Sequence, residues 1–252
     1  MSEDLSIAQT EEAAESGYER VLGFVREQIL EGRLKVGDRL LAERELAVRL
    51  GVSRPVVREV LRALSAMGVI EIRHGHGSVV REPDTRGLGD LFTLMLAQRA
   101  DVIDDVIEAR IAIERHAVRL AALRANAADL TRIEAAWRDI RETIDDPVRG
   151  SEADFEFHRR LVEAAHAPTL SGLYAAISTL LRRSHLERRQ RITGVQGIDA
   201  YLVDHHRLIL EALVERDGDR ADALLAQHFA IGSDFQRRAM VAGLRGKQEA
   251  GA

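Results

Sequence analysis

Apolar residues recur with a helical period along the first part of the chain. Tyr18 to Leu30 is one such segment, and Gly32 ends it. Arg39 to Leu64 holds two more. The first of these stops at Gly51, a residue suited to a left-handed helix end, and the second begins after Ser53, which offers an N-cap oxygen. The pattern predicts three helices, the last two joined by a tight turn.

The last of these helices has two unlike sides. Its apolar stripe consists of Val57, Val60, Leu61 and Leu64. Arg54, Arg58 and Arg62 recur every four residues and so share the opposite face. A short helix, a glycine turn and a helix with arginines at its N-terminal end have the geometry that enters a DNA major groove. Arginines on a helix are also common as plain solvated surface, so the motif alone leaves both interpretations open.

After Met67 the spacing of apolar residues changes from the helical period to the alternation typical of strands. Val69, Ile70 and Ile72 predict one strand and residues 78–80 another, with His74 to Gly77 at the tip of a hairpin. Three helices followed by a hairpin predict a winged helix-turn-helix domain, in which tip glycines let the backbone approach phosphates. The two histidines of the tip also fit ordinary exposed turn residues.

The remainder of the chain has helical periodicity and no strand pattern, which predicts a bundle of about seven helices. We place them near 88–98, 102–124, 127–144, 152–165, 169–190, 198–216 and 219–243. The fold class is therefore mainly α. We expect a disordered tail at 1–16, the winged domain at 17–82, a linker at 83–89, the helical domain at 90–243 and a tail at 244–252.

Composition agrees with helices. Hydrophobic residues make up 46% of the 252 residues but aromatic ones only 4%, so the cores must be aliphatic. The absence of cysteine excludes disulfides and thiolate metal sites. We find no apolar run that could span a bilayer and no signal peptide, and so expect a cytoplasmic protein.

Charge is unevenly distributed. The segment 17–83 has twelve basic and nine acidic residues, a net charge of +3. Because the whole chain has a net charge of −5, the remainder carries −8. A basic module on an acidic chain is typical of a local nucleic-acid-binding surface.

The second half contains histidines on several predicted helices. Asp154 and His158 are four residues apart and so lie on one helix face. His205 and His206 belong to a later helix, and His228 to the last. Each alone fits a packed core residue or a surface hydrogen bond. Three helices that each supply an inward carboxylate or imidazole favour a bound divalent cation, because such groups are costly to bury unsatisfied.

The stretch VREQILEGRLKVGDRLLAERELAVRLGVSRPVVREVLRALSAMGVIEIRHGHGSVV resembles the DNA-binding domain of the GntR family of bacterial transcription regulators. The resemblance implies DNA contacts at Arg44, Ser53, Arg54, Pro55, Val56, Arg58, His74 and Gly75. The family often has proline where Leu41 stands and threonine where Pro55 stands. Pro55 and Val56 can therefore offer only backbone or apolar contact. One arginine could pair with guanine while the others neutralise phosphates.

The second domain resembles the FCD ligand-binding domain of the FadR branch of the same family. Matching residue by residue implies metal ligands at Asp154, His158, His206 and His228, with His205 as an alternative to His206. One oxygen and three nitrogens suit Zn, Ni, Co or Mn, with Zn as the first candidate. Arg110 matches a recurrent arginine of that domain and could bind an effector carboxylate, or instead form a salt bridge to Glu114.

The resemblance implies a homodimeric regulator, not an enzyme, that binds a palindromic DNA operator and responds to a small organic acid. Two alternatives are a DNA-binding protein whose metal only stabilises the bundle, and a metal-dependent hydrolase. The hydrolase is disfavoured, because the chain has no nucleophile elbow, HExxH motif or phosphate loop.

Overall fold

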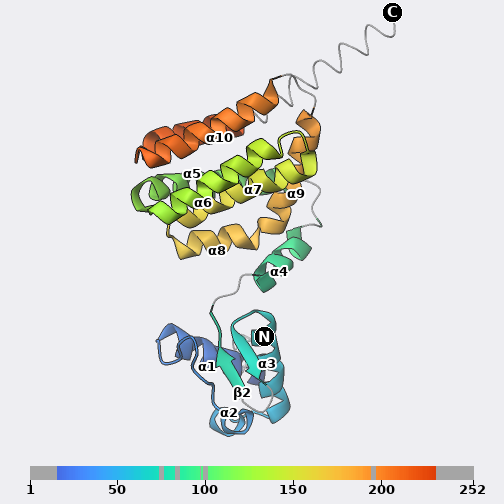
Figure 1. The fold of residues 1–252 in the computed structure, drawn as a ribbon. Coiled ribbons are helices and arrows are strands. Elements are labelled where there is room, and N and C mark those ends of the chain that lie inside the picture. Colours follow the sequence, from blue (N-terminus) through green and yellow to red (C-terminus); the bar gives the residue numbers. More distant parts are fainter. Residues whose placement is uncertain are drawn as a thin grey trace, which may run out of the picture. The chain divides into compact units, whose positions relative to one another are not determined.

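The structure, a computed structural model, describes residues 16–73, 77–82, 86–96, 98, 102–193 and 197–230. The chain divides into two compact units, Met1–Gly87 and Leu88–Ala252. Each unit has a hydrophobic core of its own. Figure 1 shows the strands in the first unit and the stacked helices of the second. This is the predicted fold class, a winged helix-turn-helix domain followed by an all-helical bundle.

The first unit begins with α1 (Gly17–Leu30), α2 (Glu43–Leu50) and α3 (Arg54–Ala66). Ser16 and Glu19 form a capping box at the start of α1, because the side chain of each accepts a hydrogen bond from the backbone N–H of the other. The predicted stripe of α3 is buried, and it packs with Val21 and Val25 of α1 and Leu46 of α2.

The turn between α2 and α3 depends on Gly51, which has a φ of 63° and ends α2 in the left-handed conformation as predicted. Ser53 precedes α3 with an extended backbone, but its side chain accepts no capping hydrogen bond, so that detail of the prediction is wrong. One contribution comes from Pro55, the second residue of the helix. A cap oxygen bonds the N–H of the second or third helical residue, and proline removes the first of these donors.

The wing is an antiparallel hairpin of β1 (Ile70–Arg73) and β2 (Gly77–Val80). Its register pairs Ile70 with Val80 and Arg73 with Gly77. Ile70 and Val80 are both buried, and they fix the hairpin to the core of the three helices. The predicted tip residues His74 and Gly75 lie outside the described residues.

Part of the predicted linker is helical, because α4 (Arg86–Leu96) begins inside it. Gly87 and Gly89 belong to the predicted linker, but both lie within this helix. At each of them the helix backbone comes close to backbone atoms of another segment. A Cβ on Gly87 would lie 2.7 Å from the backbone oxygen of Ala66, and a Cβ on Gly89 3.4 Å from that of Ala176. The glycines thus allow close packing of backbone.

The second unit continues with α5 (Val102–Arg124), α6 (Ala127–Glu142), α7 (Pro147–Ala164), α8 (Pro168–Ala176), α9 (Ser178–Ile192), α10 (Ile198–Val214) and a helix over 218–230. The single helix predicted for 169–190 is therefore two helices that meet at Ile177, where ψ is 4°. Neither glycine nor proline marks this junction in the sequence, which is why the helical period did not show it.

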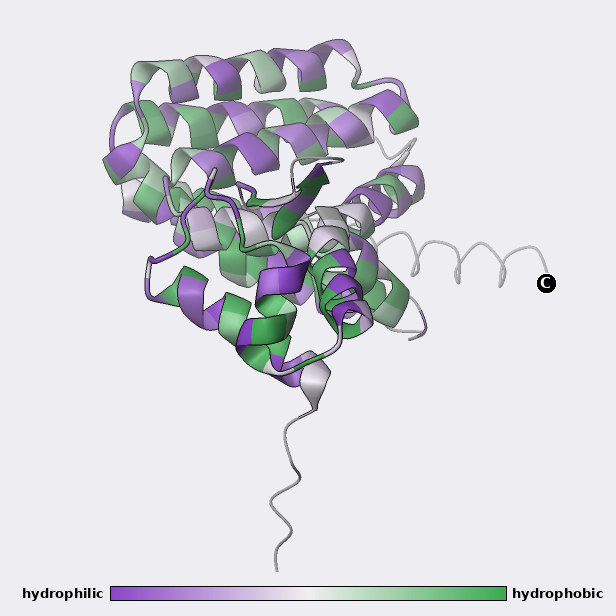
Figure 2. Cartoon of the chain, turned by 90° about the horizontal axis from the view of Figure 1, so that it is seen from below, coloured by the Kyte–Doolittle hydropathy of each residue, from purple (hydrophilic) through white to green (hydrophobic). Residues whose placement is uncertain are grey.

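Helix α7 lies at the centre of the bundle and packs against α5, α6 and α9. Phe155, Phe157 and Leu161 of α7 are fully buried in the core. Figure 2 shows hydrophobic and hydrophilic residues alternating around the helices, as the sequence period requires. None of the described helices is both long enough and apolar enough to cross a membrane.

Candidate metal centre and nucleic-acid interface

The exposed side of α3 presents the three arginines found in the sequence. Arg54, Arg58 and Arg62 are exposed, while the apolar stripe of the same helix is buried. Ser53 and Pro55 at the start of this helix are exposed as well, and so is Arg44 of α2. Val56 is only partly exposed, because it packs against the core.

A carboxylate from α2 lies among these arginines. Glu43 accepts two hydrogen bonds from Arg58, one from Nε at 3.3 Å and one from Nη2 at 2.9 Å. Arg54 Nη2 lies 4.0 Å from the same carboxylate. The hydrogen bonds from Arg58 lower the pKa of Glu43, so the carboxylate is ionised. The sequence gives no sign of this contact, because a glutamate near a helix start is also expected from the helix dipole.

In the second unit, Asp154, His158, His206 and His228 lie together. Asp154 and His158 come from α7, His206 from α10 and His228 from the 218–230 helix. Each offers one ligand atom, and all four atoms lie within 4.8 Å of one another. All four residues are buried, with His158 and His206 fully so.

The orientation of His206 is fixed by the backbone. Its Nδ1 lies 2.7 Å from the carbonyl oxygen of Leu202, and a carbonyl can only accept, so Nδ1 carries the proton. Burial lowers the pKa of His206, which keeps the ring neutral. Its Nε2 lone pair then points at Oδ1 of Asp154, 2.8 Å away. Two acceptors at this distance repel each other unless a cation neutralises them.

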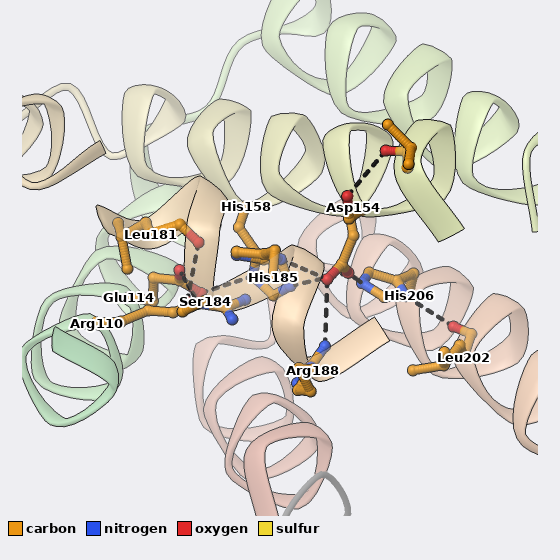
Figure 3. A network of polar contacts seen from close by, with 12 residues as sticks. Arg110, Glu114, Asp154, His158, Leu181, Ser184, His185, Arg188, Leu202 and His206 are labelled. Atoms are coloured by element: carbon orange, nitrogen blue, oxygen red, sulfur yellow. Dashed lines mark hydrogen bonds and ion pairs between the residues drawn. The ribbon is translucent and has the colours of Figure 1, made fainter. Parts of the chain in front are cut away.

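Asp154 is held from its other side by α9, as Figure 3 shows. Its Oδ2 lies 2.6 Å from Nδ1 of His185 and accepts a hydrogen bond of 3.2 Å from Nη2 of Arg188. Burial alone would raise the pKa of Asp154, but the contact with His185 outweighs it and lowers the pKa well below its usual value. The carboxylate is therefore ionised, with Oδ1 directed at the other candidate ligands.

His185 approaches Asp154 from α9, and no partner nearby in the sequence indicates its place in this site. It is buried, and burial, helped by the charge of Arg110, lowers its pKa to about 3. Its α9 neighbours include several arginines, and this charged surrounding is typical of an exposed helix face. The side chain of His185 points inward because of how α9 packs against the other helices, and the spacing of apolar residues along α9 does not reveal this packing.

A second carboxylate, Glu114 of α5, supports His158. Glu114 Oε2 lies 2.6 Å from Nδ1 of His158, while Oε1 accepts hydrogen bonds from Nε of Arg110 at 2.7 Å and from the hydroxyl of Tyr174 at 2.8 Å. Burial would raise the pKa of Glu114, but Arg110 and His158 outweigh it and lower the pKa to about 2. A carboxylate close to the second ring nitrogen of a ligating histidine is common around protein-bound metals.

Arg110 makes the salt bridge to Glu114 that the sequence offered as one of two interpretations. Its guanidinium also lies over the ring of Phe229, 4.9 Å from the centroid. Nη2 of Arg110 is nevertheless buried without a hydrogen-bond partner. The salt bridge therefore leaves donor capacity on this side chain for an anion.

The other histidines of the second unit have different surroundings. His205, the alternative to His206, stacks on Tyr201 with ring centroids 4.3 Å apart and is outside the four-residue group. His166 lies 2.7 Å from Asp129, whose backbone N–H donates to the Asn126 cap of α6. His116 is exposed on α5.

The four clustered residues fit a divalent cation. Asp154 Oδ1, His158 Nε2, His206 Nε2 and both ring nitrogens of His228 are buried without a hydrogen-bond partner. Burial lowers the pKa of His228 well below its usual value, so this ring too is in the neutral form that binds metals. A carboxylate oxygen and three imidazole nitrogens are a ligand set that zinc and other first-row metals accept.

Two family models match the chain, one for each unit. "Bacterial regulatory proteins, gntR family" matches residues 17–80, and "FCD domain" matches residues 105–230. The chain belongs to the GntR family. It is therefore a transcription regulator with a DNA-binding helix-turn-helix and an FCD domain, and its relatives are named as regulators and not as enzymes.

Curated relatives of this GntR regulator match over most of their length. "HTH-type transcriptional regulator LutR" of Bacillus subtilis is 32% identical over 79% of this chain and 92% of its own. The "Galactonate operon transcriptional repressor" of Escherichia coli is 30% identical over 81% of this chain and 90% of its own. A solved structure titled "Streptococcus agalactiae GntR" has a TM-score of 0.64 at 23% identity and covers 86% of this chain and 99% of its own, a likeness of fold.

Proposed function

We propose that this regulator is a homodimer whose affinity for a palindromic operator is set by a small organic acid bound beside a divalent metal in the helical unit. Asp154, His158, His206 and His228 would hold the metal, with zinc as the first candidate. The observation that carries the proposal is the 2.8 Å approach of two acceptors, Asp154 Oδ1 and His206 Nε2, inside a buried group of four ligand atoms.

The residues around the four ligands have separate tasks in this proposal. His185 and Arg188 hold one oxygen of Asp154, so that the other faces the site. Glu114 orients His158, and Arg110 offers a buried, unpaired N–H to an anion. A metal bound here supplies positive charge that attracts a carboxylate. The name of the E. coli relative, a regulator of a galactonate operon, supports an acid as the effector, because galactonate carries a carboxylate.

The DNA-binding side of the proposal assigns contacts to Arg44, Ser53, Arg54, Pro55, Val56, Arg58, His74 and Gly75. The exposure of the described arginines of this set supports contact with phosphates or base edges. An effector changes operator affinity only if it binds one arrangement of the two DNA-binding units more tightly than another.

Metal binding is tested first, with the metal alone. Protein freed of metal with EDTA is titrated with Zn²⁺, Ni²⁺, Co²⁺ or Mn²⁺ in competition with a chelating indicator. We expect one site per chain, which His158→Ala and His228→Ala abolish. The matched control is His116→Ala, which removes an exposed histidine from the same unit and should leave binding unchanged. Equal loss in the control, or no uptake of any metal, would refute the proposal.

The effector is tested on DNA. Duplexes that the protein binds are selected from a random pool, and their affinity is measured with single mono- and dicarboxylic acids, with and without metal. We expect at least one acid to change the affinity only in the metal-loaded protein. Metal binding without any effect of acids on DNA affinity would favour the alternative of a metal that only stabilises the bundle.

A further inference from the structure

An acidic side chain lies among the exposed arginines of α3, and its position is unusual for a surface that binds a polyanion. Glu43 is the first residue of α2 and reaches Arg58 on α3, fifteen residues later. Its side chain is 32% exposed and that of Arg58 51%. A carboxylate here repels DNA phosphates of any sequence, so its effect on general affinity is unfavourable.

The contact is a two-point one. Glu43 Oε1 accepts from Nε of Arg58 and Oε2 accepts from Nη2, so the planar carboxylate lies along the side edge of the planar guanidinium. Such a pair fixes direction as well as distance. The five N–H groups of arginine are rigidly arranged, and the pair with Glu43 uses two of them.

The N–H groups that remain lie at the end of the guanidinium. One on Nη1 and one on Nη2 point away from the Cα and form a second fork. The O6 and N7 atoms of guanine form the acceptor pair that such a fork binds in the major groove. Glu43 therefore leaves free the part of Arg58 that can recognise a base, while it removes the rotational freedom of the side chain.

We propose that Glu43 is a positioning residue for sequence recognition: it directs the end of Arg58 at a base pair and lowers affinity for all other DNA. An exposed ion pair contributes roughly 0–1 kcal/mol to folding, so stability alone gives Glu43 little importance. The proposal concerns the first unit only and does not depend on the metal or the acid.

The test uses the full chain, without added metal or acid, and duplexes selected from a random pool by the wild type. Affinity is measured at one salt concentration for the selected duplex, for each of its single-base-pair variants and for an unrelated duplex. The proteins are the wild type, Glu43→Gln, Arg58→Lys, the double variant, and Glu59→Gln as the control. Glu59→Gln removes the same charge from an exposed position next to Arg58 on α3.

For Glu43→Gln we expect tighter binding to the unrelated duplex, by up to about fivefold. We expect discrimination to fall about fivefold or more at one base pair and little at the others, because a two-point contact with a base contributes roughly 1–3 kcal/mol of discrimination. Arg58→Lys should lose discrimination at the same base pair. Adding Glu43→Gln to Arg58→Lys should change it no further, since the carboxylate acts through the arginine.

Several results would overturn the proposal. One is discrimination that is unchanged in Glu43→Gln, or that falls equally at every base pair. Another is a fall of the same size in Glu59→Gln. A third is a full additional loss in the double variant, which would mean that Glu43 acts without Arg58. A selection that enriches no sequence would overturn it too. Unfolding curves of all variants show whether a change comes from loss of fold.

Discussion

Replacing Glu114 with glutamine tests the buried network beside the candidate metal ligands. The substitution keeps the size of the side chain and removes its charge. Arg110, whose side chain is 3% exposed, would then be a buried cation without its ion-pair partner. The hydroxyl of Tyr174 and Nδ1 of His158 would also lose the carboxylate that lies 2.8 and 2.6 Å from them.

Two arguments give the same size of effect. Removing one partner of a buried ion pair costs about 3–5 kcal/mol. The pKa of Glu114 is lowered to about 2, roughly two units below its ordinary value, which corresponds to about 3 kcal/mol of preference for the charged form. We therefore expect Glu114→Gln to lower the free energy of unfolding by about 3–5 kcal/mol, a large part of the roughly 5–15 kcal/mol of a typical domain.

The assay is urea unfolding at pH 7 in EDTA, so that no bound metal contributes. The chain has a single tryptophan, Trp137 in α6, so its fluorescence reports on the helical unit alone. The matched control is Glu134→Gln, which breaks the exposed pair with Arg138 on the same unit and should cost less than 1 kcal/mol.

A loss in Glu114→Gln no larger than that in the control would refute the reasoning. The combined replacement Arg110→Met and Glu114→Leu provides a second check. It removes both charges, so it should cost less than Glu114→Gln alone.

Three further predictions concern other parts of the chain. Asp222→Asn removes the charge that accepts hydrogen bonds from Arg115 and Arg119, so hydrogen exchange over 218–230 should become faster, with a cost of about 1.5–3 kcal/mol. Gly51→Ala places a Cβ at a φ of 63° and should lower the unfolding free energy of the first unit by about 1–2 kcal/mol in calorimetry; an unchanged melting curve would contradict this. For Asp129, burial raises the pKa, but the hydrogen bond from Asn126 and the contact with His166 outweigh it and lower the pKa. Its contribution to stability is then complete above the ordinary pKa of about 3.9 and is lost as pH falls through the lowered value. The advantage of wild type over Asp129→Asn in urea unfolding should therefore be present at pH 5 and shrink as the pH falls below about 3.9.

The sequence predicts the elements well wherever glycine or proline separates amphipathic segments. Gly51 and Pro55 place the turn of the first unit, and the apolar stripe of α3 predicts its buried side. The break at Ile177 could not be predicted, because apolar and small residues continue across it without a helix-breaking residue. Gly87 and Gly89 predict a linker, because glycine occurs in a sequence both where the chain is free and where two backbones pack closely.

The surroundings of the candidate site were less predictable than its four clustered residues. A spacing of four places Asp154 and His158 on one face of α7 whatever else packs there. The distinction between His205 and His206 depends on a difference of about 100° around α10, which the sequence does not resolve. Glu114 and His185 reach the site from α5 and α9, and only tertiary packing brings these helices to α7. Glu43 and Arg58 likewise meet across a turn between two helices.

The gathering of Asp154, His206 and His228 from three separate helices has a consequence for protein synthesis. While the ribosome is still making the chain, α7 emerges with two of the clustered residues, and His206 follows 48 residues after His158. The fourth follows 22 residues later, in the last described helix. A nascent chain that ends before residue 228 therefore lacks one residue of the proposed metal site. If these residues hold a metal as we propose, tight binding of the cation must wait until this last helix has left the exit tunnel and docked.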